Sequence, residues 1–114
     1  MNIRQLRKLL EFWVEILNLP EWKIEVKWGT KKNLEECVGR NYFSIEELDS
    51  LILIDKNGDD IEGTLVHELL HLVLDGHRDV DLTNKYDPML ERAINRTAAA
   101  MIKLVGRSTF EVTN

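Results

Sequence analysis

Apolar and charged residues alternate at helical spacing in the first segment of the chain. Apolar side chains recur every three or four residues from Ile3 to Leu17, with charged side chains between them. This pattern predicts an amphipathic helix that Asn18 and Pro20 end. Residues 22–28 instead alternate strictly between apolar and charged types, which is typical of a strand with one buried face.

Two further strand candidates follow. Residues 38–43 form a less regular one, in which Gly39 indicates a bulge or an edge position. The apolar run 51–54 is typical of an inner strand, and the turn at Asn57 and Gly58 ends it.

Two helices are expected in the second half of the chain. The first begins near Asp59, whose carboxylate caps it while Glu62 reaches back, and it runs to residue 74 or 75. The second takes Asp87 as N-cap and Pro88 as its first residue, and it ends at Gly106. The order predicts an α+β fold: an N-terminal helix, a small three-stranded sheet with antiparallel pairing, and two C-terminal helices.

Length and composition narrow the class of protein. The 114 residues, 44% of them hydrophobic, suit one domain with a small core spanning residues 1–114. A net charge of −5 argues against nucleic acid or an anionic membrane as partner. A single cysteine excludes an intrachain disulfide, and charges throughout residues 1–20 exclude a signal peptide or membrane span. We therefore expect a cytoplasmic protein.

The most informative motif is His67-Glu68-Leu69-Leu70-His71. In a helix, His71 lies about 40° around and about 6 Å along from His67, so both imidazoles can bind one ion. Glu68, at about 100°, flanks that ion and is free to hold a water. Gly63, one turn earlier, leaves room for a ligand. The apolar stripe of the same helix lies elsewhere, at Leu65, Leu69, Leu72 and Val73.

Tetrahedral catalytic zinc needs a third protein ligand and keeps one position for water. Glu91, in the first turn of the last helix, is favoured because it borders the apolar arc of that helix. His77 is the alternative, since it lies ten residues after His67. However, sites with that spacing need a glycine three residues after the second histidine, where this chain has Leu74.

These residues resemble zinc metallopeptidases of the gluzincin type, and the layout is most similar to the small minigluzincins. The resemblance implies a minimal zincin-like fold, an active-site helix carrying His67, Glu68 and His71, and a glutamate helix carrying Glu91. It also implies a latent form in which a terminal segment, here residues 107–114, blocks the cleft; a frayed terminus is the alternative. One departure is Asn95, where larger gluzincins often have an aspartate that orients a zinc-bound histidine.

The chemistry expected of such a site is peptide hydrolysis, with a peptide or protein as substrate. Glu68 acts as general base and then as general acid, and Tyr86 and His77 are candidate donors to the oxyanion. One alternative is a zinc-stabilised binding or regulatory module without turnover. The other is a three-histidine metal-dependent endoribonuclease, against which both Glu68 and the acidic charge argue.

Overall fold

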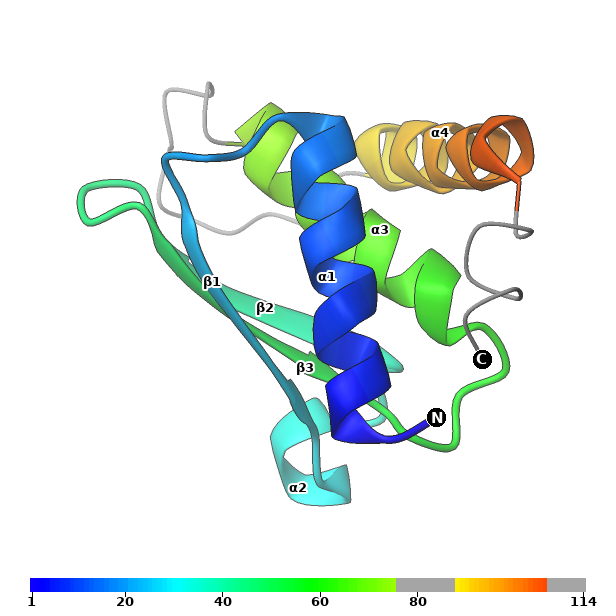
Figure 1. Ribbon diagram of the computed structural model, residues 1–114. Coiled ribbons are helices and arrows are strands. Elements are labelled where there is room, and N and C mark those ends of the chain that lie inside the picture. Colours follow the sequence, from blue (N-terminus) through cyan, green and yellow to red (C-terminus); the bar gives the residue numbers. More distant parts are fainter. Residues whose placement is uncertain (76–87, 107–114) are drawn as a thin grey trace. The chain divides into compact units, whose positions relative to one another are not determined.

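The computed structural model describes residues 1–75 and 88–106 of the chain (Figure 1). The chain divides into two compact units, residues 1–78 and 79–114. One domain over the whole chain stays a prediction. Within the described residues, no helix has the length and apolar character that crossing a bilayer requires.

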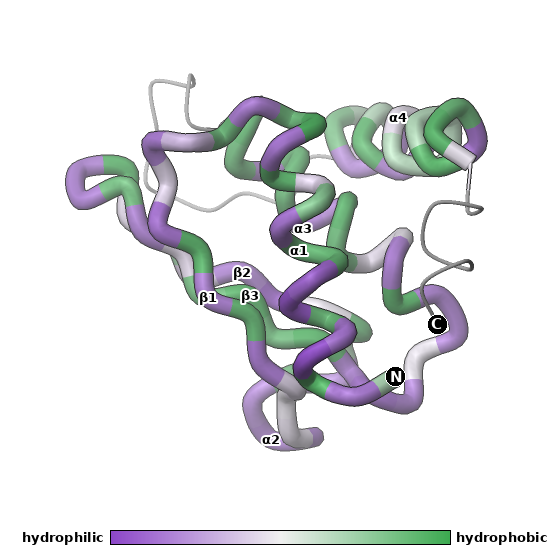
Figure 2. Tube along the Cα trace, in the orientation of Figure 1, coloured by the Kyte–Doolittle hydropathy of each residue, from purple (hydrophilic) through white to green (hydrophobic). Residues whose placement is uncertain are grey.

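The first helix, α1 (Ile3–Leu17), begins and ends where the sequence predicts. The Asn2 side chain accepts a hydrogen bond from the backbone N–H of Gln5, and the Gln5 side chain accepts one from the backbone N–H of Asn2. Asn18 ends the helix in the left-handed region, at φ 54°. Figure 2 shows hydrophobic and hydrophilic residues alternating around this helix. Its buried residues are Leu6, Leu9, Leu10 and Trp13.

Three strands form one mixed sheet in the order β1-β3-β2. They are β1 (Lys23–Trp28), β2 (Gly39–Ser44) and β3 (Asp49–Ile54). β2 and β3 are antiparallel neighbours, whereas β1 and β3 run parallel with Val26 opposite Ile52. The structure confirms β3 as the inner strand and places Gly39 on an edge strand.

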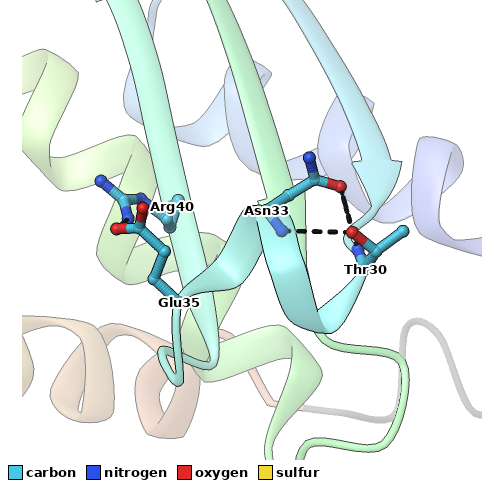
Figure 3. Close-up of polar contacts among 4 residues, drawn as sticks. All are labelled: Thr30, Asn33, Glu35 and Arg40. Atoms are coloured by element: carbon cyan, nitrogen blue, oxygen red, sulfur yellow. Dashed lines mark hydrogen bonds and ion pairs between the residues drawn. The ribbon is translucent and has the colours of Figure 1, made fainter.

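A short helix that the sequence analysis missed, α2 (Lys31–Leu34), follows β1. Thr30 caps it: the Thr30 hydroxyl accepts a hydrogen bond from the backbone N–H of Asn33, and the Asn33 side-chain oxygen accepts one from the backbone N–H of Thr30 (Figure 3). Beside it, Glu35 accepts a hydrogen bond from Arg40 of β2, and this bond raises the pKa of the Arg40 guanidinium.

The helix α3 (Ile61–Asp75) and α1 cover one face of the sheet (Figure 1). α3 contacts β2 and β3, and α1 contacts β1 and α3. The core between these layers includes Trp13, Val26, Ile52 and Leu69, all almost fully buried. The predicted packing of helices on one face is therefore confirmed for α1 and α3.

The N-terminus of α3 differs in detail from the prediction. The helix begins at Ile61, and the Asp60 carboxylate, not that of Asp59, accepts a hydrogen bond from the Gly63 backbone N–H at 2.9 Å. Asp60 also occupies the space beside Gly63, because a Cβ there would lie 2.2 Å from its Oδ2. The room that the sequence analysis assigned to a ligand is therefore filled by the cap.

The second unit contributes the helix α4 (Pro88–Val105). Pro88 is its first residue, as predicted, and Gly106 follows it at φ 77°. Ile94 and Ala98 are its buried residues. The proposed N-cap Asp87 lies outside the described residues.

Candidate metal centre

The two histidines of the motif lie side by side on one turn of α3. The Nε2 atoms of His67 and His71 are 3.3 Å apart, and their ring centroids are 5.0 Å apart. Both side chains are half-buried. The helix alone produces this juxtaposition, because residues four apart lie on the same face.

The separation of the two nitrogens can be compared with the spacing of two ligands on one zinc ion. Two nitrogens bound to tetrahedral zinc at 2.0–2.1 Å lie about 3.4 Å apart, which agrees with the 3.3 Å between His67 and His71. A hydrogen bond between two neutral imidazoles has a similar length. The geometry therefore fits both arrangements, and metal titration distinguishes them.

Glu68 differs from its neighbours in the motif because its side chain is buried, with 9% of its surface exposed. Its carboxylate lies beside β2: a Cβ built on Gly39 would be 3.5 Å from the Glu68 Oε2. Tertiary contacts pack this carboxylate against the edge strand. Its expected place beside a bound ion, where it would hold a water, stays a prediction.

The close approach of β2 to α3 depends on Gly39. A Cβ at this position would lie 2.5 Å from the Thr64 Cγ2, closer than nonbonded carbons come. Thr64 cannot easily turn away, since its hydroxyl donates a hydrogen bond to the Asp60 carbonyl oxygen at 2.8 Å. The glycine is therefore explained by helix–strand packing next to the motif.

Two polar residues near the motif were not among the predicted site residues. Asn41 of β2 donates a hydrogen bond from Nδ2 to the backbone carbonyl oxygen of Glu68, at 3.0 Å. Ser50 of β3 donates from Oγ to the Asn41 Oδ1, at 2.6 Å. An asparagine on the inner face of a strand is an available sequence signal, because asparagine is depleted in strands.

Glu91, the favoured third ligand, lies in the first turn of α4 and is half-buried. Like each histidine of the motif, it offers an atom of the type that binds metal ions. Arg92 and Arg96 on the same helix are exposed, as expected for a solvated face. Asn95 is exposed as well. Glu91 belongs to the second unit, whereas the histidines belong to the first.

Three predictions about the functional site fall on residues that the structure does not describe. His77, the alternative ligand, and Tyr86, the candidate oxyanion donor, lie within residues 76–87. The proposed regulatory tail, residues 107–114, is also outside the described residues. These assignments stay predictions.

Comparisons of this chain with protein-family models, with curated proteins and with solved structures return no match. The resemblance to gluzincins therefore stays an expectation from the sequence, based on the motif at residues 67–71 and on Glu91.

Proposed function

We propose that this chain is a zinc-dependent metallopeptidase in which His67, His71 and Glu91 bind the metal. The observation behind the proposal is the 3.3 Å separation of the two histidine Nε2 atoms, which suits adjacent ligands of tetrahedral zinc as well as a hydrogen bond between the rings. Two imidazoles and one carboxylate form a common donor set of catalytic zinc sites that keep a position for water. His77 is the alternative third ligand.

A zinc ion held by His67, His71 and Glu91 would supply Lewis acidity, which lowers the pKa of a zinc-bound water to about 7 in enzymes of this kind. Glu68 accepts the proton from the attacking water. The same carboxyl then gives this proton to the amine nitrogen as the peptide C–N bond breaks. The burial of Glu68 suits this role, because a general base in an active site acts where bulk water is excluded.

The proposed substrate is a peptide or a protein, and the proposed location is the cytoplasm. Nucleic acid and membrane are not proposed as partners, since the net charge is −5.

The experiment compares zinc binding with peptide hydrolysis in three variants. Glu68→Gln is expected to bind zinc like the wild type and to lose hydrolysis of a quenched fluorescent peptide library. His67→Ala is expected to lose both. Glu11→Gln, which neutralises an exposed glutamate of α1, is the matched control and is expected to change neither. Full activity of Glu68→Gln would contradict the mechanism.

The same assay tests the alternative of a zinc-binding module without turnover. Asn95 motivates this alternative, because larger gluzincins often have at that position an aspartate that orients a zinc-bound histidine. Both the full chain and a chain ending after Gly106 are assayed. Activity in the shortened chain alone supports a latent peptidase, whereas zinc binding without hydrolysis in either form supports the binding module.

A further inference from the structure

The edge strand β2 makes a polar contact with the backbone of the motif itself. The Asn41 Nδ2 donates to the carbonyl oxygen of Glu68, which lies between the two histidines in the sequence. In the middle of a helix such a carbonyl already accepts the N–H four residues later. The asparagine therefore uses the second lone pair of the oxygen and links sheet to helix without breaking the helix.

The orientation of this asparagine is itself fixed. The Ser50 Oγ donates to the Asn41 Oδ1, so the amide oxygen faces β3 and the amide nitrogen faces α3. Ser50 is buried, with 5% of its surface exposed. A hydrogen bond shielded from water competes less with solvent than an exposed one. The chain from Ser50 through Asn41 to Glu68 therefore joins the inner strand, the edge strand and the motif helix.

A second contact lies on the same face of β2, two residues earlier. Gly39 faces the Glu68 carboxylate and Thr64, and the space of its missing side chain lets α3 approach the strand. Gly39 thus sets how closely the helix approaches. Asn41, two residues further along, bonds the motif turn at one point on the strand.

We propose that Asn41 is a positioning residue for the metal site, holding the turn with His67, Glu68 and His71 in one place on the sheet. This role rests on the proposed function, because it requires that His67 and His71 bind a metal ion. Displacing ligands by a fraction of an ångström weakens a metal site. Groups hydrogen-bonded to the ligands themselves typically contribute 10–100-fold in affinity, and we expect a bond to the backbone between two ligands to contribute at the lower end of that range.

The chain offers a matched pair of substitutions to test this role. Asn41→Asp keeps the shape and the oxygen that accepts from Ser50, but it loses the N–H donated to Glu68. Asn33→Asp adds the same charge in α2, where the hydrogen bonds of the side chain use only its oxygen. Figure 3 shows that side chain facing Thr30. Ser50→Ala is the second test variant, because it frees the Asn41 amide to turn.

Each variant is titrated with zinc against a chelating dye and with cobalt, whose visible absorption bands report the geometry of its ligands. We expect Asn41→Asp to bind zinc about tenfold more weakly and to shift the cobalt bands. Ser50→Ala is expected to change the zinc affinity and the cobalt bands in the same direction as Asn41→Asp, but to a smaller extent. Asn33→Asp is expected to leave both unchanged. Hydrogen exchange of the metal-free proteins is expected to be faster in α3 of Asn41→Asp.

A merely structural role would lower the midpoint of unfolding but leave zinc affinity and the cobalt spectrum of the folded protein unchanged. That result in both Asn41→Asp and Ser50→Ala would overturn the positioning role while leaving the proposed function intact. If the wild type binds no zinc, the proposed metal site fails, and the positioning role fails with it. The two failures are therefore distinguished by the wild-type titration.

Discussion

The indole Nε1 of Trp13 donates a hydrogen bond to the Glu62 Oε2 at 2.9 Å, and this bond joins α1 to the first turn of α3. Trp13 is fully buried, with 0% of its surface exposed. The sequence pattern predicts a capping role for Glu62 within its own helix. The structure gives its carboxylate a partner 49 residues earlier in the chain.

Replacing Trp13 by phenylalanine tests this link. Trp13→Phe removes the donor and part of a buried ring, and the lost bond to a carboxylate alone is expected to cost about 1.5–3 kcal/mol in the free energy of unfolding. Glu62→Gln keeps an accepting oxygen and should cost less. Urea unfolding measures both. Trp28, a half-buried tryptophan on β1, provides the control. If Trp28→Phe lowers the free energy of unfolding as much as Trp13→Phe does, ring size alone explains the effect and the hydrogen bond does not.

The cap of α3 gives a second prediction. Asp60→Ala removes the carboxylate that accepts from the Gly63 N–H and is expected to lower the free energy of unfolding by about 1 kcal/mol. Asp59→Ala, the neighbouring substitution of the same type, is expected to stay within about 0.5 kcal/mol of the wild type. If Asp59→Ala lowers the free energy of unfolding more than Asp60→Ala does, Asp59 is the N-cap.

The approach of β2 to α3 gives a third prediction. Gly39→Ala places a methyl group 2.5 Å from the Thr64 Cγ2 and is expected to cost about 1–3 kcal/mol of stability. Thr64→Ser removes that methyl and keeps the hydroxyl that donates to Asp60. We therefore expect the double variant to recover much of the loss. A double-mutant cycle by thermal or urea unfolding measures the coupling, and strict additivity would exclude the contact.

The third metal ligand gives a fourth prediction. Glu91→Gln is expected to weaken zinc binding by at least about 100-fold, because a direct ligand contributes more than the 10–100-fold typical of outer partners. His77→Gln is expected to leave the affinity unchanged. Competition with a chelating dye measures both. A large loss in His77→Gln with none in Glu91→Gln would assign the third ligand to His77.

The spacing of apolar residues and the residues at helix ends predicted most of the helices and strands, because interactions between residues close in the sequence determine where these elements form. The spacing of apolar residues located α1, and Pro88 and Gly106 located the ends of α4. The parallel pairing of β1 with β3 was not predicted, since it depends on strands separated by another strand. The short α2 was also missed, because four residues carry too little periodicity to detect.

By itself the sequence determined that His67 and His71 share one face of a helix, because a four-residue spacing and the helical repeat fix that relation. Only the tertiary structure decided what surrounds Glu68: the space at Gly39, the bond from Asn41 and the orientation that Ser50 imposes. These contacts join residues from three separate elements. These contacts form because the sheet packs against α3. The spacing of residues along the chain does not reveal that packing.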